Sequence, residues 1–295
     1  MDIKIEKVDQ LKRTLKIKID GNRFSEDKNK IYLEIGKTLK VPGFRPGTAP
    51  LEILEKRFGN LLKEEFLKRM VPVYCDEAFK NNNLDVVNLP KIYDLNLKDD
   101  SLTFSLDVEI KPQIDIDEKV YKGINIKDIK IEIKEEEVEK FITNLKEGIK
   151  KYIDKDLDDN SIAKWLSYAD IESFKNAIRT DLFIQKANDR IRKIQNQVKN
   201  HLLKEIKFKV PNSQIEAQKE ELLRQNIEQL KLQGITDEDI EKYKKDLEEK
   251  VASVAEEQVK LYYILEAISK KENIKVENEL FEVVIGFILS NANYT

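Results

Sequence analysis

The ten residues from Val41 to Pro50 constrain this chain of 295 residues more than any other segment, because three prolines and two glycines surround Phe44 and Arg45. Each proline fixes its own φ angle and pushes the residue before it out of the helical region. The glycines allow the sharp reversals of direction that such a segment needs. The segment therefore predicts a stiff, exposed loop that joins neither flanking helix, with Phe44 and Arg45 at its tip.

An aromatic ring and a guanidinium held rigidly in water suit docking onto a large anionic partner, because guanidinium pairs with phosphate and carboxylate groups and stacks on rings. Lys37, Lys40 and Arg45 make the loop and its approach basic, and no acidic residue occurs from Gly36 to Ala49. On spacing alone the alternative is an ordinary turn between helices, with Phe44 packed back on the protein, since loops carry function often but not always.

Composition limits the class of protein. Charged residues make up 37% of the chain, against about 25% in an average globular protein, which is typical of long solvated helices. The net charge is −3, so contact with nucleic acid would need a local basic patch. Cys75 is the single cysteine, so an internal disulfide is excluded and a reducing compartment fits. We expect Cys75 in the core, because it follows Tyr74 in an apolar run.

The sequence shows no membrane-targeting feature. The first residues alternate charged and apolar side chains and lack the apolar stretch of a signal peptide. The longest apolar stretch, residues 283–289, is far too short to span a membrane. We expect a cytoplasmic protein with no membrane partner.

The hydrophobic pattern of the first part predicts a small antiparallel sheet. Apolar and polar residues alternate over residues 11–19 and 102–110, as in half-buried strands. Residues 92–97 form a third expected strand, joined to the second by a polar turn at 98–101.

Two helices are expected between these strands. Ser25 can cap the first, and Pro50 begins the second, since proline is favoured in a first turn. The second helix runs past Met70 and is expected to bury the apolar residues Ile53, Leu54, Phe58, Leu61 and Leu62. The order of elements predicts a small α+β domain over residues 1–112.

Residues 113–295 have mainly helical patterns and predict an elongated second domain with helical arms. Residues 113–120 are polar and read as a linker, and an extended segment is expected over 124–133. A break at 209–213 offers Asn212 or Ser213 as the cap of the next helix. Gly234 ends that helix, and another begins at Thr236 and runs to about Lys271. This later helix has too many apolar residues for one narrow seam: Val251, Val254, Val259, Tyr262, Tyr263, Leu265 and Ile268.

The sequence gives little support for catalysis. His201 is the only histidine, so a zinc-type site or a Ser-His-Asp triad has little to build on, and we expect a partly buried packing residue. The 56 Asp and Glu residues read as solvated helix faces. No catalytic, metal-binding or cofactor-binding residue is predicted.

The loop resembles the signature of trigger factor, the bacterial ribosome-associated chaperone. The matching residues are Gly43, Phe44, Arg45, Gly47 and Pro50, followed by a helix with Arg57-Phe58-Gly59. In that family the loop docks on the large ribosomal subunit beside the peptide exit tunnel, on a ribosomal protein and nearby rRNA. The resemblance implies that Gly43, Phe44, Arg45 and Gly47 bind the ribosome. Pro46 and Thr48 stand where the family has lysines, which removes two cations from the tip.

The resemblance extends over nearly the whole chain. Residues 121–124 leading to 135–138 resemble the beginning of the family's C-terminal domain, and residues 210–215 and 261–268 resemble its arm helices. In the family an FK506-binding-type prolyl isomerase domain of roughly a hundred residues precedes the long arm helix, and the interval 148–170 is too short for one.

The chain also ends soon after Phe281, where the family usually continues into more of the second arm. We therefore expect a shortened form of trigger factor that lacks the isomerase domain. What the interval 148–170 does in place of that domain is left open.

The favoured hypothesis is an ATP-independent chaperone that docks at the exit tunnel, shields apolar segments of nascent or unfolded chains, and assists folding and export. The candidate client contacts are Leu222, Leu223, Ile227, Leu230, Phe281, Val284, Phe287 and Ile288. Each could instead be a packing residue, since helix stripes are usually core. The alternatives are a prolyl isomerase, which the short interval disfavours, and a helical adaptor that dimerises. Client preference and a homodimer of the free protein are left open.

Overall fold

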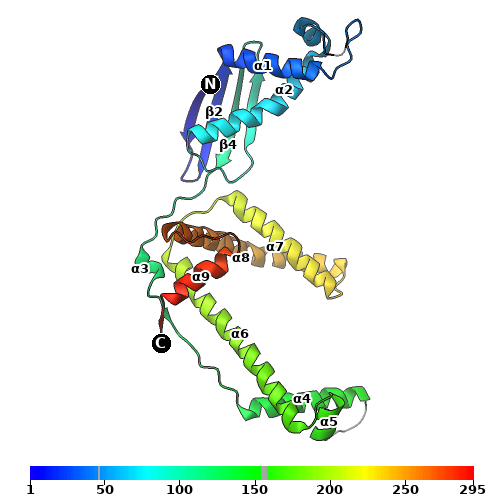
Figure 1. The fold of residues 1–295 in the computed structure, drawn as a ribbon, viewed down its shortest axis with the longest axis vertical. Coiled ribbons are helices and arrows are strands. Elements are labelled where there is room, and N and C mark those ends of the chain that lie inside the picture. Colours follow the sequence, from blue (N-terminus) through cyan, green and yellow to red (C-terminus); the bar gives the residue numbers. More distant parts are fainter. Residues whose placement is uncertain (46, 154–157) are drawn as a thin grey trace. The chain divides into compact units, whose positions relative to one another are not determined.

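The computed structural model describes residues 1–45, 47–153 and 158–295 (Figure 1). The chain forms two compact units, and each unit combines two segments of the sequence. Unit 1 contains residues 1–114 and 208–263, and unit 2 contains residues 115–207 and 264–295. The predicted division into a first functional domain of residues 1–112 and a second of residues 113–295 stays a prediction.

A four-stranded antiparallel sheet forms the first part of unit 1. Its strands follow the order β1-β2-β4-β3 and have the bounds β1 Asp2–Lys7, β2 Lys12–Asp20, β3 Lys91–Leu97 and β4 Ser101–Glu109. Leu15 lies opposite Leu106, and Ile17 lies opposite Phe104, so the alternating apolar residues share one buried face. The three predicted strands are confirmed, and β1 is an additional edge strand.

Two helices, α1 (Gly21–Gly36) and α2 (Leu51–Asn81), cross one face of this sheet (Figure 1). Phe66 is fully buried, and its ring meets the rings of Phe24 and Tyr32 edge-on at centroid distances of 5.7 and 6.2 Å. Cys75 lies in the same core, as predicted, and burial raises the pKa of its thiol to about 11. A thiol with so high a pKa is an unreactive packing residue at neutral pH.

Each of the two helices differs from the prediction in one place. The first helix begins at Gly21, and Ser25 is not its cap: the Ser25 hydroxyl donates to the Gly21 carbonyl at 3.3 Å. The second helix begins at Leu51, directly after Pro50, but the backbone at Phe58 leaves helical geometry (φ −126°, ψ 20°). The buried face continues on both sides of this kink, with Leu54, Leu62 and Phe66 buried, but the expected burial of Leu61 is wrong; its side chain is 40% exposed.

The second part of unit 1 is built from α7 (Asn212–Leu232) and most of α8 (Asp237–Lys271). The prediction that Asn212 or Ser213 caps α7 with its own side chain is wrong, because Pro211 occupies the cap position. The carboxylate of Glu109, at the end of β4, supplies the cap instead. It accepts hydrogen bonds from the Ser213 N–H at 2.9 Å and from the Ser213 hydroxyl at 2.6 Å.

Unit 2 is assembled around α6 (Ile171–Glu205), against which α9 (Leu280–Ser290) lies. The expected linker at 113–120 is partly structured: α3 (Glu118–Tyr121) lies within unit 2, and the buried Tyr121 donates its hydroxyl hydrogen to Glu272 at 2.5 Å. Of the expected extended segment, residues Asn125–Ile126 form β5, which pairs in parallel with β6 (Asn293–Tyr294).

His201 is a partly buried packing residue, as predicted, and its Nε2 lies 3.0 Å from the Val120 carbonyl oxygen.

The interval 148–170 belongs to a small helical core of unit 2. It contains the end of α4 (Glu135–Ile153), residues 154–157, which lie outside the described part, and α5 (Asp159–Trp165). Ile162 of α5 packs in one cluster with Val138 and Ile142 of α4 and with Phe174 and Ile178 of α6. Arg179 of α6 also pairs with Glu135 of α4 at 2.9 Å. The interval thus completes a compact three-helix cluster.

Candidate functional site

The loop between α1 and α2 is anchored at both ends in the core of unit 1. Val41 and Ala49 are buried, and both belong to the cluster formed by the sheet and the two helices. The described residues between them are exposed. Because its two ends are fixed in a packed core, the loop has a defined place on unit 1.

Two reverse turns follow each other within the loop. In the first, the Phe44 N–H donates to the Val41 carbonyl at 3.1 Å, and Gly43 has a φ of +90°. In the second, the Thr48 N–H donates to the Arg45 carbonyl at 3.0 Å, and Gly47 has a φ of +80°. Glycine is the residue that adopts a positive φ without strain. The expectation that the glycines provide the reversals is confirmed, while Pro46 lies outside the described residues.

Phe44 and Arg45 lie at the junction of the two turns. Phe44 is 40% exposed, and Arg45 is also exposed. The predicted exposure of both side chains is confirmed. Their role in binding the ribosome, like that of Gly43 and Gly47, stays a prediction.

The loop and its surroundings are basic. The exposed cations Lys37, Lys40, Arg45, Lys56 and Arg57 occur within or near it in sequence. Among the residues that the structure describes, none of these five forms an ion pair. The Arg57 guanidinium lies 3.5 Å from the Pro42 carbonyl, to which it donates. Cations without a carboxylate partner remain available to an anionic ligand. The sequence indicates Arg57 only as part of the family signature, and not among the cations of the loop.

The candidate client contacts fall in two groups of different exposure. Leu222, Leu223, Ile227 and Leu230 on α7 are all partly exposed, and this helix has no buried residue. Leu232 at its end is 85% exposed and was not among the predicted contacts, although it continues the same run of leucines. In unit 1 the helix therefore carries an apolar stripe that the described fold leaves partly open to solvent.

The second group lies on α9 in unit 2. Phe281 and Phe287 are partly exposed, whereas Val284 and Ile288 are buried. Solvent therefore reaches both phenylalanines but not the side chains of Val284 and Ile288. A role of any of these four residues in client binding stays a prediction.

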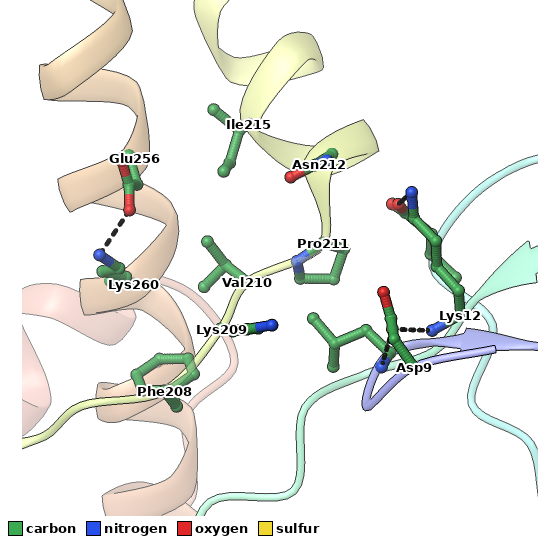
Figure 2. A pocket seen from close by; sticks show the side chains of 12 residues that line it. Asp9, Lys12, Phe208, Lys209, Val210, Pro211, Asn212, Ile215, Glu256 and Lys260 are labelled. Carbon is green, nitrogen blue, oxygen red and sulfur yellow. Dashed lines mark hydrogen bonds and ion pairs between the residues drawn. The ribbon is translucent and has the colours of Figure 1, made fainter. Parts of the chain in front are cut away.

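A cavity of about 550 Å³ lies in unit 1 near the beginning of α7 (Figure 2). Asp9, Glu256 and Lys260 are among its charged lining residues. The Asp9 carboxylate accepts backbone hydrogen bonds from Leu11 and Lys12, both at 2.7 Å, which lower its pKa, and Glu256 pairs with Lys260 at 2.5 Å. These carboxylates are satisfied within the chain. Across residues 1–45, 47–153 and 158–295, no group of three or more metal-ligating side chains comes together.

Two family models match the chain. The model described as "Bacterial trigger factor protein (TF)" matches residues 1–145, and that described as "Bacterial trigger factor protein (TF) C-terminus" matches residues 170–293. Only residues 146–169 lie between the two matched ranges.

Curated relatives and a solved structure agree with these matches. The trigger factor of Natranaerobius thermophilus is 34% identical over 151 residues, which are 50% of this chain and 33% of the relative. The trigger factor of Caldicellulosiruptor saccharolyticus is 30% identical over 190 residues, which are 61% of this chain and 42% of the relative. The solved structure, described as "Promiscuous Substrate Recognition in Folding and Assembly Activities of the Trigger Factor Chaperone", covers 94% of this chain and 87% of its own at a TM-score of 0.53 and 13% identity.

A basic loop on a four-stranded sheet with two covering helices, followed by long helices with open apolar stripes, defines an α+β protein with a mainly helical second part. The chain belongs to the trigger factor family. The matched regions span a third to about two fifths of the length of the curated relatives. In the described part of the chain, no helix has the length and apolar character that crossing a bilayer requires.

Proposed function

We propose that this protein is an ATP-independent chaperone that docks on the large ribosomal subunit at the exit tunnel. It shields apolar segments of nascent or unfolded chains in the cytoplasm, and so assists their folding and export. In this proposal residues 1–112 form the docking domain, and residues 113–295 bind the client. The observation that carries the proposal is the anchored loop, which exposes Phe44 and Arg45 among cations without ion-pair partners in the described part of the chain.

Docking on rRNA and ribosomal protein follows from this chemistry. The chain as a whole has a net charge of −3, so general attraction to nucleic acid is weak and the local basic patch decides where contact occurs. A guanidinium binds phosphate through two parallel hydrogen bonds, and the neighbouring phenyl ring adds apolar contact. Gly43 and Gly47 contribute through the turns that expose these side chains.

Client binding follows from the open stripe on α7. Partly exposed leucines offer apolar contact area, while the charged residues around them, such as the Arg224–Glu221 pair, keep the surface hydrated. Exposed apolar patches commonly mark interaction sites. Contacts of this kind are weak and adaptable, so a client can leave without nucleotide hydrolysis. Phe281 and Phe287 add exposed aromatic area in unit 2.

Serine in place of Leu222 and Ile227 should reduce the ability of the full chain to suppress aggregation of a denatured model protein without nucleotide. Both side chains are partly exposed on a helix with no buried residue, so the melting temperature should fall by no more than a few degrees. Light scattering of the aggregating client measures the activity, and thermal unfolding measures the stability.

Val284→Ser is the matched control, because Val284 is buried on α9. It should cost a few kcal/mol of stability, as polar or cavity-forming changes in a core do. If the α7 variant unfolds as readily as Val284→Ser, the stripe is packing rather than a client surface. If the variant keeps its stability and holds the client as well as the parent protein, the stripe is not a client surface.

We also propose that this chain is not an enzyme. A prolyl isomerase needs an apolar pocket that receives the proline ring, and the residues between the two matched ranges, 146–169, are too few to form a domain of their own. We expect no acceleration of cis-to-trans exchange in a proline peptide above its uncatalysed relaxation, which takes tens of seconds or longer. A protease-coupled peptide assay at micromolar protein measures this rate, and a clear enhancement would refute the proposal.

The alternative that remains to be tested is a helical adaptor that dimerises through the stripe on α7, at whose end Leu232 is 85% exposed. Light scattering over a dilution series separates the two functions. A chaperone should suppress aggregation at concentrations where the chain is monomeric, whereas an adaptor should lose its activity on dilution.

A further inference from the structure

Residues 127–132 of unit 2, which we call the strap, lie in extended conformation between β5 and α4 and are held by side chains of α6. Gln197 of α6 binds the backbone of Lys127 in both directions. The Lys127 N–H donates to the Gln197 side-chain oxygen, and the Gln197 side-chain N–H donates to the Lys127 carbonyl, both at 2.9 Å. An amide that pairs with a main chain in this way can hold any extended segment, whatever its side chains.

Two cations of α6 hold the strap by charge. The Arg190 Nε donates to one carboxylate oxygen of Asp128 at 2.6 Å, and a terminal guanidinium nitrogen donates to the other. These bonds fix orientation as well as charge, and they lower the pKa of Asp128, so its carboxylate is ionised at neutral pH. The Lys186 ammonium donates to the Glu132 carbonyl at 2.7 Å. Spacings of four and seven from Lys186 to Arg190 to Gln197 place all three on one face of α6.

The strap is fastened by polar contacts at its surface and can open locally. All six of its residues belong to the described part of the chain, and none of them is buried. Ile129, which follows Asp128, is 58% exposed. Asp128 and Arg190 are themselves partly exposed, and ion pairs of this kind add little stability and are weakened by salt. Segments with few buried apolar contacts open at low free-energy cost, so the strap can leave α6 while the core of unit 2 stays folded.

A cavity of about 380 Å³ adjoins the strap in unit 2. Its walls combine the Asp128–Arg190 pair with apolar side chains of α6, α9 and β6, namely Ile191, Ile194, Leu289 and Tyr294. A mainly apolar cavity with a few placed polar groups is typical of a ligand site. Because Asp128 belongs to the strap, release of the strap would widen this cavity and leave the Arg190 guanidinium without its carboxylate.

We propose that this face of α6 binds an extended client segment in which an acidic residue neighbours an apolar one, and that the strap occupies the face until such a segment competes for it. The strap itself provides the pattern, because Asp128 is followed by Ile129. Arg190 selects the acidic residue by charge, the cavity receives the apolar side chain, and Gln197 holds the backbone. This inference rests on the proposed function, since it names a class of client segment and the device that controls its binding in unit 2.

The test titrates the full chain at low salt with a fluorescently labelled peptide of residues 125–134, which reads Asn-Ile-Lys-Asp-Ile-Lys-Ile-Glu-Ile-Lys. The strap of the parent protein reduces the apparent affinity to the fraction of molecules in which α6 is open. Asp128→Asn in the protein weakens the strap but keeps Arg190, so it should bind the peptide about two- to fivefold more tightly, the range for one exposed ion pair. Adding Arg190→Gln to this variant should cancel the gain. Fluorescence anisotropy measures the binding.

Asp189→Asn is the matched control, because Asp189 lies on α6 and pairs at 4.0 Å with Arg192 of the same helix. It should bind the peptide as the parent protein does. Trypsin cleavage after the exposed Lys130 follows the strap directly, since cleavage tracks the population of the open form. Asp128→Asn should be cut about two- to fivefold faster than the parent protein or the control. Circular dichroism of each variant should show an unchanged fold.

The outcomes separate the inference from the proposed function. If Asp128→Asn is cut no faster than the parent protein, the strap is not releasable by its ion pair, and the inference is overturned. If cleavage is faster but peptide binding is unchanged, or if a peptide with asparagine in place of its aspartate binds equally well, α6 does not recognise an acidic segment, and the inference is again overturned. A parent protein that binds the peptide but suppresses no client aggregation would contradict the proposed function and leave the binding face on α6 standing.

Discussion

Alanine in place of both Phe44 and Arg45 should abolish co-sedimentation with ribosomes while leaving the fold intact. The two side chains are exposed at the junction of two turns, so their removal leaves the core of unit 1 unchanged. Aromatic and arginine anchors carry much of the free energy of an interface, and losing two of them should weaken binding about a hundredfold or more. Sedimentation through a sucrose cushion measures the bound fraction.

The matched control is another exposed phenylalanine and arginine, Phe183 and Arg192 on α6. Alanine at both should leave ribosome binding unchanged. For the parent protein we also expect only a modest salt dependence, with a slope that matches about one to three phosphate contacts. Unaltered sedimentation of the Phe44 and Arg45 double variant would rule out docking by the loop.

Phe66→Ala should destabilise unit 1 by about 3–5 kcal/mol, the range for a large buried aromatic residue. The ring is fully buried and meets two other aromatic rings edge-on, so its loss removes apolar burial and leaves a cavity between α1, α2 and the sheet. Hydrogen exchange of the β2 and β4 amides measures this loss locally, because these strands form the centre of the sheet.

Leu61→Ala is the control on the same helix. Its side chain is 40% exposed, and we expect a change within about 1 kcal/mol. Equal losses of amide protection in the two variants would contradict the division between the buried and exposed faces of α2.

The parts of the fold that the sequence predicts are those set by neighbouring residues. Strict alternation located β2 and β4, and the prolines and glycines at 42–47 located the exposed loop. The cap of α7 was missed because its partner is distant in the sequence. Glu109 reaches Ser213 across 104 positions of the sequence, and no pattern near residue 213 indicates a carboxylate supplied from a strand.

The candidate site shows the same limit. Exposure of Phe44 and Arg45 follows from local turn chemistry, and it could be predicted. The burial of Val284 and Ile288 on α9 could not be predicted, because these two residues have the same helical spacing as a client-facing stripe would have. Which face of an apolar helix is covered depends on its packing partner, here α6, and this partner becomes known only when the tertiary structure is described.

The interleaving of the two units has a consequence for the order in which the protein itself folds during synthesis. The buried cluster of the sheet, α1 and α2 ends at Val108, whereas unit 2 combines residues 115–207 with 264–295. A growing chain can therefore complete its sheet early, but unit 2 must wait until the second segment of unit 1 has been made. The last pairing, of β5 with β6, joins residues nearly 170 positions apart, as in the bond from Thr295 to Ile126. Closing so long a loop is entropically costly and slow, so each newly made copy should carry a finished loop between α1 and α2 while unit 2 is still incomplete.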